Sequence, residues 1–316
     1  MKILVVTNMF FSRNKKMPYA GVFVTEQVDA LRAAGIDCDV YIIDGFRGMW
    51  RYFTSAIHLY WKLLFSSYDV IHVHYGLSGL FTLLNPFIRW RKVILTLHGG
   101  DILPDQGKHI QVMLTRLIVR RVGGIIILNE QMRDELKHVR CKIWRMPCGV
   151  DETLFNGVYD GRQDVVIFPS SPDRAVKNFP LFRKICTEFF ARYGEMSVVF
   201  VDGLNREEVA ELFSRASILL MTSISEGSPQ VVKEALLCDL PVVSTDVGDV
   251  RDVVDGTPGC AVFDRTASLD QVAALMKAAI NEANASPGER RRRVLALGLD
   301  QSSVIGRLID VYRAMS

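Results

Sequence analysis

Two glutamates, Glu226 and Glu234, stand eight positions apart in the segment EGSPQVVKE. Ser228 is a favoured N-cap residue and Pro229 a favoured first residue of a helix, so the segment predicts a helix start. The N–H groups and positive dipole end there attract an anion such as a phosphate. A carboxylate accepts hydrogen bonds from two vicinal hydroxyls, so two of them suit a phosphate flanked by two diols, as in a nucleotide sugar. The alternative is that Glu226 is an ordinary acid at a helix start and that Glu234 is exposed to solvent.

A basic loop, FPSSPDRAVKN at residues 168–178, follows a predicted strand in the same half of the chain. Arg174 could bind two phosphate oxygens and Lys177 could supply a point charge. Ligands of open parallel sheets bind at the carboxyl ends of the strands, so this loop should share an edge with Glu226. The alternative is that both cations are merely solvated.

The first half of the chain carries histidines at predicted strand ends. His98 and Asp101 belong to the segment TLHGGD, in which two glycines let a ligand approach the backbone. A neutral His98 imidazole can hydrogen-bond a sugar hydroxyl or a leaving group. His72 and His74 share one face of a strand and could be metal ligands, but no third ligand is near, so no metal site is predicted. We assign His74 and Asp101 to the acceptor side.

Gly21 ends a polar loop, residues 8–20, after the first predicted strand, and it opens a helix. Its N–H could therefore face the donor phosphates. The loop carries Arg13, Lys15 and Lys16 but no GxGxxG pattern, and GxxxxGK[ST] occurs nowhere in the chain. These patterns predict neither a dinucleotide site nor a P-loop.

Short apolar strands alternate with amphipathic helices along the whole chain, which predicts parallel sheets covered on both faces. Pro147 and Gly149 mark a boundary, after which a new strand–helix series begins. We expect two Rossmann-like, doubly wound α/β domains facing a cleft, at residues 1–150 and 151–300. A C-terminal helix, 301–316, should pack back on the first domain. The expected strands are 3–7, 39–43, 70–74, 93–97, 124–128, 164–168, 197–201, 218–221 and 241–244. The expected helices are 23–34, 52–65, 111–121, 131–137, 180–193, 207–216, 229–237, 269–283 and 304–315.

Composition narrows the function classes. The chain has 316 residues, 49% of them hydrophobic, and a net charge of +3. A chain with this much apolar material is not disordered, and so weak a charge argues against nucleic acid as a partner. The first apolar run is too short for a signal peptide, and no stretch of 18 uninterrupted apolar residues occurs. Six scattered cysteines suggest neither disulfides nor zinc, so a cytoplasmic location is expected.

These residues together resemble the retaining nucleotide-sugar glycosyltransferases of family 4 (glycosyl transferases group 1), which have the GT-B fold. The resemblance lies in the E-x7-E segment 226–234, the HGGD segment 98–101, the GVD linker 149–151 and, more loosely, the Arg174 to Lys177 loop. The pattern is most similar to the subgroup that builds teichuronic-acid-type and other cell-envelope polysaccharides or glycolipids. It implies transfer from a UDP- or GDP-sugar to a hydroxyl of a sugar or lipid-linked glycan acceptor, with no cofactor and no metal.

The resemblance also implies roles for individual residues. Glu226 would bind donor-sugar hydroxyls and Glu234 the ribose diol, while Arg174 and Lys177 neutralise the diphosphate. Gly227 and Ser228 would offer backbone N–H groups, and His98 would contact the reacting sugar. His98, Glu226 and Lys177 are thus the expected catalytic residues.

Two departures from the family pattern stand out. The usual arginine falls at Ser171, so Arg174 is a substitute for it. Only residues 202–206 separate a strand from the next helix where another strand and helix are usual, which predicts a smaller second sheet.

Other functions remain open. A nucleotide-sugar 2-epimerase or a non-catalytic nucleotide-sugar-binding protein could share this fold, whereas the missing glycine fingerprint disfavours a dehydrogenase. The aromatic helix Trp50–Leu64 is interpreted either as core or as a peripheral contact with an anionic membrane, at the inner face of the cell membrane. The run Arg290–Arg293 is interpreted as a solvated helix face or, alternatively, an anionic-lipid contact.

Overall fold

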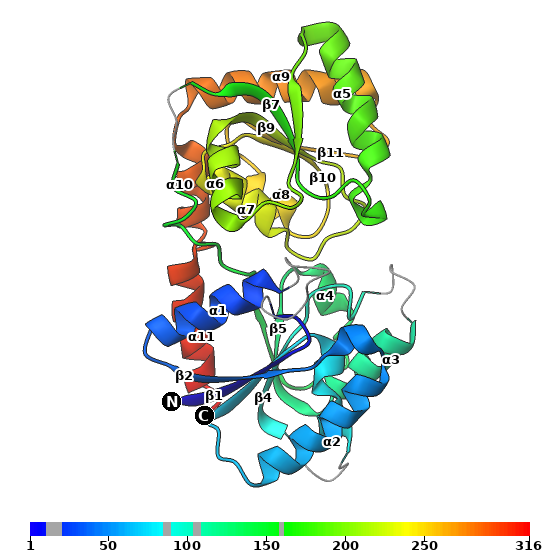
Figure 1. Cartoon of the computed structure of the whole chain (residues 1–316), viewed down its shortest axis with the longest axis vertical. Coiled ribbons are helices and arrows are strands. Elements are labelled where there is room, and N and C mark those ends of the chain that lie inside the picture. Colours follow the sequence, from blue (N-terminus) through cyan, green and yellow to red (C-terminus); the bar gives the residue numbers. More distant parts are fainter. Residues whose placement is uncertain (11–20, 85–89, 104–108, 158–160) are drawn as a thin grey trace. The chain divides into compact units, whose positions relative to one another are not determined.

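The computed structural model describes residues 1–10, 21–84, 90–103, 109–157 and 161–316. It divides into two compact units, shown in Figure 1. The N-terminal unit is Met1–Gly149 together with Gln301–Ser316, and the C-terminal unit is Val150–Asp300. Each unit is built on a parallel sheet, so the predicted pair of Rossmann-like α/β domains is confirmed. No helix in the described ranges is long and apolar enough to cross a bilayer.

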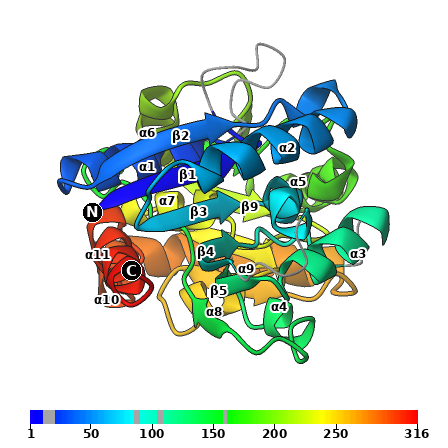
Figure 2. The same cartoon turned by 90° about the horizontal axis from the view of Figure 1, so that it is seen from below.

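The N-terminal unit contains a six-stranded parallel sheet in the order β2-β1-β3-β4-β5-β6, and Figure 2 shows the first five of these strands in succession. Its central strands are nearly all apolar because helices cover both faces. The strands are β1 (Lys2–Thr7), β2 (Asp37–Ile42), β3 (Val70–His74), β4 (Trp90–Thr96), β5 (Val122–Ile127) and β6 (Lys142–Arg145).

Helices cover the two faces of this sheet in separate layers. Helices α1 (Val22–Ala33) and α11 (Gln301–Arg313) share one core with β1, and Figure 2 shows α11 away from α2 and α3. The other layer holds α2 (Trp50–Leu64), the 3₁₀ segment η2 (Gly76–Leu83) and α4 (Gln131–Asp134), together with the end of α3 (His109–Ile118). A single 3₁₀ turn, η1 (Gly45–Arg47), precedes α2. The expected C-terminal helix is therefore α11, which packs on α1.

The C-terminal unit contains a five-stranded parallel sheet in the order β11-β10-β9-β7-β8, which confirms the predicted smaller second sheet. Helices α5 and α9 share one core with this sheet, and α6, α7 and α8 share the other; Figure 1 shows α9 above the strands. The strands are β7 (Gln163–Phe168), β8 (Ser197–Phe200), β9 (Ala216–Met221), β10 (Val242–Thr245) and β11 (Cys260–Phe263). The helices are η4 (Ala175–Lys177), α5 (Phe179–Tyr193), α6 (Arg206–Arg215), α7 (Gln230–Leu237), α8 (Val250–Val254), α9 (Leu269–Ala285) and α10 (Glu289–Ala296).

The environment of the arginine run in α10 agrees with neither interpretation from the sequence. Arg290 is 1% exposed, and its guanidinium pairs with Asp239 at 2.8 Å and donates to several backbone carbonyls. Arg291 and Arg293 also donate to backbone carbonyls, and only Arg292 points outward, beside Glu289. The run is therefore neither a solvated face nor a lipid contact, because its cations satisfy carbonyl groups at the ends of neighbouring elements.

Candidate active site

The basic loop and the E-x7-E segment meet within the C-terminal unit. Lys177 ends η4, just after β7, and Glu226 lies in the loop between β9 and α7. Strands β7 and β9 are neighbours in the sheet, so both loops leave the same edge. The Lys177 Nζ lies 2.6 Å from Glu226 Oε1, with side-chain exposures of 8% and 17%. Lys177 and Glu226 thus form an ion pair at this edge, which the sequence analysis did not predict.

Backbone and hydroxyl contacts fix the position of Lys177. The Thr222 hydroxyl contacts the carbonyl oxygens of Lys177 and Asn178 at 3.0 and 3.1 Å. The Ile224 N–H donates to the Val176 carbonyl at 2.8 Å. Asn178 adopts a left-handed conformation with φ 54°, which turns the chain sharply from η4 into α5. The ammonium group is therefore held on a structured turn.

Glu234 is buried and paired, which excludes the interpretation of a solvated acid. Its Oε1 lies 2.7 Å from Arg206 Nη1, and its side chain is 5% exposed. Arg206 is the first residue of α6, and its guanidinium lies 4.7 Å above the Phe155 ring. The sequence analysis missed Arg206. Its place at the start of the helix that follows β8, on the same sheet edge as Lys177, is the signal that could have found it.

Ser228 has a different role from the predicted N-cap. Helix α7 begins at Gln230, with Pro229 in the cap position and no side-chain cap. The Ser228 hydroxyl instead contacts Asp249 Oδ2 at 2.6 Å and accepts from Lys233 Nζ at 2.5 Å. Lys233 and Asp249 form an ion pair at 3.4 Å whose side chains are 0% and 1% exposed. This buried pair takes the hydroxyl away from the helix end, so the prediction that Ser228 caps α7 is wrong.

A tight backbone approach shapes the loop that carries Gly227. A Cβ at Gly248 would lie 2.6 Å from the Gly227 carbonyl oxygen, and Gly248 has a φ of +61°. Only glycine fits there without moving the loop. Two remote segments, 226–228 and 246–249, are thereby fixed against each other ahead of α7.

Arg174 lies apart from this cluster of contacts. It is exposed, and among the described residues its side chain contacts only Ser170 Oγ, at the long distance of 3.5 Å. The structure brings together Lys177 with Glu226 and Arg206 with Glu234, whereas Arg174 as a diphosphate ligand remains a prediction.

A chain of three histidines lies at the carboxyl end of β3 and β4 in the N-terminal unit. His98 Nε2 lies 3.2 Å from His74 Nδ1, and the His72 ring lies against the His74 ring. His72 in turn contacts the Tyr312 and Thr96 hydroxyls at 2.6 and 2.7 Å. His74 Nε2 is buried and has no partner among the described residues.

Burial keeps these imidazoles uncharged. Desolvation lowers the pKa of His98 to about 4 and, with a contribution from His98, the pKa of His72 to about 3. The pKa of His74 also lies well below its ordinary value because the ring is buried among the other two. All three rings are neutral at pH 7, so His98 can exchange hydrogen bonds with an uncharged ligand group. In the described ranges, no group of three or more His, Cys, Asp and Glu side chains is arranged to hold a metal ion.

Asp101 positions the loop that carries His98. Its Oδ1 accepts the His98 N–H at 3.0 Å and its Oδ2 accepts the Gly76 N–H at 2.9 Å. The side chain is fully buried, and burial raises its pKa to about 6 even though these backbone hydrogen bonds oppose the shift. Both carboxylate oxygens are thus engaged by the backbone, and Asp101 acts through His98.

Gly21 opens α1 and tolerates no side chain. Its φ is +87°, and a Cβ there would lie 2.4 Å from the Met9 carbonyl carbon. No side chain caps α1 in the described part of the chain. The basic residues predicted ahead of it, Arg13, Lys15 and Lys16, lie outside the described residues.

Comparison with known proteins agrees with this arrangement. The family description "Glycosyltransferase Family 4" matches residues 20–154, and "Glycosyl transferases group 1" matches residues 183–281. N-acetyl-alpha-D-glucosaminyl L-malate synthase of Bacillus anthracis is 24% identical over 290 residues, covering 77% of this chain and 74% of that protein.

Solved structures share the fold of the whole chain. Sucrose-phosphate synthase from Thermosynechococcus elongatus superposes with a TM-score of 0.77 at 16% identity, covering 100% of this chain and 99% of that one. Anabaena HepE in complex with UDP superposes with a TM-score of 0.70 at 13% identity, covering 99% and 100%. The first family match lies almost entirely in the N-terminal unit and the second in the C-terminal unit. These matches identify the chain as a glycosyltransferase of family 4, and the solved structures show that it has the GT-B fold.

Proposed function

We propose that this glycosyltransferase moves a sugar from a UDP- or GDP-sugar to a hydroxyl acceptor, with retention of anomeric configuration and without a metal. The observation that carries the proposal is the ion pair of Lys177 and Glu226, 2.6 Å apart at the sheet edge ahead of α7. A fixed cation and a helix N-terminus supply positive potential for a diphosphate, and the adjacent carboxylate accepts hydrogen bonds from sugar hydroxyls.

Each candidate site residue of the C-terminal unit has a role in this proposal. Lys177 neutralises the leaving diphosphate, Glu226 binds hydroxyls of the donor sugar, and Gly227 and Ser228 present backbone N–H groups to sugar and phosphate. Arg174 is the proposed second cation for the diphosphate. Fixed charges of this kind stabilise the transition state without the cost of reorganising solvent.

Glu234 is the proposed ligand of the ribose diol, and its partner Arg206 belongs to the same subsite. Because Arg206 contacts Oε1, the diol would bind through the remaining oxygen or displace the guanidinium. Arg206 lies over Phe155 and keeps one favourable contact in either case.

Retention follows if the acceptor hydroxyl attacks the face from which the diphosphate departs. A phosphate oxygen then takes the acceptor proton, and the new glycosidic bond replaces the bond from the sugar carbon to the diphosphate. His98 is the proposed contact to the transferred sugar, supported by its neutral imidazole at a strand end. His74 is proposed on the acceptor side, and Gly21 is proposed to face the donor phosphates.

Incubation of the purified protein with radiolabelled UDP-, GDP- and ADP-sugars tests this function. Transfer to an added glycan or lipid-linked acceptor, or slow donor hydrolysis, is the expected result. Formation of the 2-epimer would favour the epimerase, and saturable binding without turnover would favour the non-catalytic binding protein. Retention is checked by the anomeric configuration of the product, and metal independence by full activity in excess EDTA.

Helix α2 supports a further part of the proposal, a peripheral contact with an anionic membrane. It is apolar on two faces: Tyr52, Ala56 and Leu59 are buried in the core. A second stripe is exposed, comprising Trp50, Phe53, Ile57, Trp61 and Leu64. The helix also carries Arg51 and Lys62 and no acidic residue. Aromatic side chains beside cations suit the interface of an anionic bilayer, where a lipid-linked acceptor for cell-envelope synthesis would lie.

Vesicle co-sedimentation tests this contact. Vesicles containing phosphatidylglycerol should retain the protein, and the variant Trp50→Ser with Trp61→Ser should lose most of that binding. Tyr193→Ser, which removes an exposed aromatic side chain from α5, is the matched control. Equal binding of all three proteins would remove α2 from the proposal. The cytoplasmic face of the membrane is part of the proposal because all six cysteines are free thiols, as is usual in a reducing compartment.

A further inference from the structure

A basic pocket lies in the N-terminal unit at the edge of the sheet opposite His98. It is lined by the segment Val119–Gly123, which leads from α3 into β5, and by the segment His138–Cys141, which leads into β6. These are the amino ends of two neighbouring strands, whereas the histidine chain lies at carboxyl ends. The pocket, of about 490 Å³, is therefore separate from the site described above.

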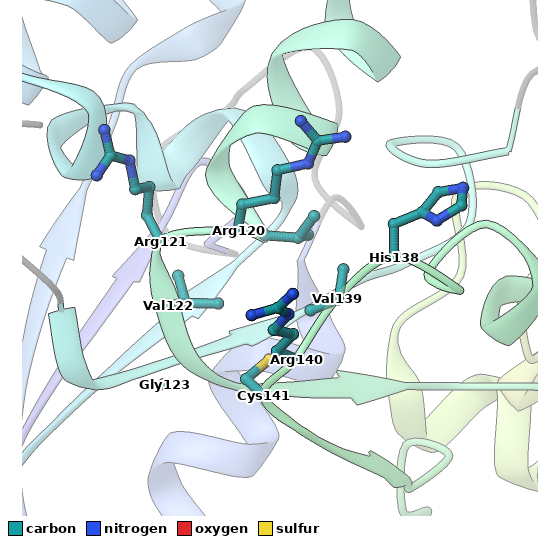
Figure 3. A pocket seen from close by; sticks show the side chains of 9 residues that line it. Arg120, Arg121, Val122, Gly123, His138, Val139, Arg140 and Cys141 are labelled. Carbon is teal, nitrogen blue, oxygen red and sulfur yellow. The ribbon is translucent and has the colours of Figure 1, made fainter.

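Three arginines and a histidine surround this pocket. Figure 3 shows the side chains of Arg120, Arg121, His138 and Arg140 extending from the two segments. Arg120 and Arg140 are exposed, and neither has a carboxylate within ion-pair distance in the described part of the chain. Guanidinium groups present paired N–H donors that match the oxygens of a phosphate.

The sequence around the pocket has an excess of basic residues. Residues 109–148 contain eight arginines and lysines but only three acidic residues. Each of the three acids is paired outside the pocket: Glu130 with Arg133, Asp134 with Lys137, and Glu135 with Arg116. Arg120 and Arg140, which have no carboxylate partner among the described residues, raise the local potential and attract an anion.

The remaining walls of the pocket are apolar. Val119, Val122, Val139 and Cys141 line it between the cations. A water molecule takes about 30 Å³ of liquid, so a volume of about 490 Å³ exceeds the need of an inorganic phosphate. Met113 and Leu117, on the helix that leads into the pocket, are exposed apolar residues. A ligand with a charged phosphate and a less polar remainder fits these walls.

We propose that this pocket binds the phosphate group of a phosphate ester, independently of the sugar-nucleotide site. The ester could be a phospholipid headgroup or a free phosphorylated metabolite, since both present the same group to the arginines. Binding requires no chemical step, and the pocket lies at the amino ends of strands in the sheet that carries His98 at its carboxyl ends.

Thermal unfolding followed by tryptophan fluorescence tests the proposal in the full chain. All four tryptophans belong to the N-terminal unit, so the signal reports the unit that holds the pocket. Glycerol 1-phosphate, inorganic phosphate, and vesicles with and without phosphatidylglycerol are the probes. Ligand that binds the folded unit raises its melting temperature with concentration.

The test variant is Arg120→Ala with Arg140→Ala, and the control is Arg133→Ala with Lys137→Ala. Both remove two positive charges from residues 109–148, but only the first alters the pocket. The test variant should weaken the apparent affinity at least tenfold while the control stays within about twofold, and both should turn over the donor at the wild-type rate.

Each outcome of the probes is informative. Saturable, pocket-dependent binding of glycerol 1-phosphate identifies a free phosphate ester, and pocket-dependent binding of anionic vesicles alone identifies a lipid headgroup. Either result supports the proposal. An equal loss of affinity in the test and control variants would mean that the probes are attracted by net charge only. An unchanged melting temperature with every probe would show that the pocket is not a phosphate site. Both results would overturn the proposal without bearing on glycosyl transfer.

Discussion

Lys177 and Glu226 depend on each other. Each is largely buried, and each would be left without its charge partner if the other were removed. An occupied donor site would give Lys177 a second anion, the diphosphate, while Glu226 turns part of its hydrogen-bonding capacity to sugar hydroxyls. On the proposed function, the pair is arranged for a ligand that carries both groups, and the loss of either member should lower turnover for a different reason.

Replacing Lys177 by Ala should lower turnover at least about a hundredfold, because the leaving diphosphate loses a fixed cation. Glu226→Ala should cost a similar factor through lost contacts to the sugar. Initial rates with saturating donor measure both effects, and circular dichroism confirms that the fold survives. Lys184→Ala, on the exposed face of α5, is the control with an equal change in charge. Wild-type turnover in Lys177→Ala would exclude this lysine from catalysis.

His98 and His74 are adjacent but should not be equivalent. His98 is only partly buried, whereas His74 is 2% exposed and contacts His98 through Nδ1. Replacement of His98 by Ala should therefore lower kcat more than replacement of His74, which acts mainly by orienting its neighbour. Steady-state kinetics of the two variants decide the ranking, with His58→Ala, at an exposed position of α2, as the control. The reverse ranking would move the sugar contact from His98 to His74.

Among the secondary-structure elements, the alternation of strands and helices could be predicted from the sequence because buried parallel strands are continuous apolar runs. Strand β3 was predicted with its observed ends, Val70 and His74. Two edge strands were missed. In β6 the sequence KIWR has only two apolar residues, enclosed by two charged ones, and β11 has only four residues, Cys260–Phe263. An edge strand needs cover on fewer sides, so its apolar signal is weak. The helix predicted over 131–137 ends at Asp134.

The residues of the candidate site could be predicted from the sequence only where they lie in one local segment. Glu226 and Glu234 share a helix start, and Lys177 lies in a loop after a strand, so spacing and topology were enough to find them. Arg206 and the buried pair of Lys233 and Asp249 were missed because their partners are distant in sequence. Such pairs follow from the packing of α6, α7 and the 246–249 loop, which no local pattern records.

Helix α10 is anchored to the C-terminal unit through Arg290. Replacing Arg290 by Ala would leave the Asp239 carboxylate buried without its cation and several carbonyls without a donor. We expect a loss of about 3–5 kcal/mol in the free energy of unfolding of this unit. Arg292→Ala, on the exposed side of α10, should change it by less than about 0.5 kcal/mol.

Far-ultraviolet circular dichroism during urea unfolding measures both variants. Tryptophan fluorescence, which reports the N-terminal unit, should show an unshifted midpoint in each of them. A similar small effect of Arg290→Ala and Arg292→Ala would mean that the arginine run is solvated after all.

At the scale of the whole molecule, the end of the chain completes the N-terminal unit. Helix α11 returns after the second unit, and its Tyr312 hydroxyl contacts His72, 240 positions earlier in the sequence. His72 lies against His74, which contacts His98. The candidate sugar contact therefore rests on a chain of buried polar groups that is assembled only when both ends of the sequence have folded together.

This buried chain predicts how the stability of the N-terminal unit depends on pH. The histidines have lowered pKa values in the folded unit, about 4 for His98 and about 3 for His72, against an ordinary value near 6.5. Below pH 6.5 the unfolded chain therefore binds protons that the folded unit excludes, and stability is lost as the pH falls. Asp101 acts in the opposite direction, since its pKa of about 6 lets the folded unit keep a proton that the unfolded chain releases above pH 3.8.

The three histidines favour proton binding by the unfolded chain, and Asp101 favours it in the folded unit. Between pH 6 and 5 the unfolded chain therefore binds about two more protons than the folded unit. The free energy of unfolding should then fall by about 3 kcal/mol per pH unit. Urea midpoints read by tryptophan fluorescence at pH 7, 6 and 5 measure this slope for the N-terminal unit. His98→Gln should reduce the slope by about 1.4 kcal/mol per pH unit, while His109→Gln, at an exposed position, should leave it unchanged. A slope near zero in the wild-type protein would mean that the three imidazoles take up protons in the folded unit, and His98 would then meet its ligand as a cation.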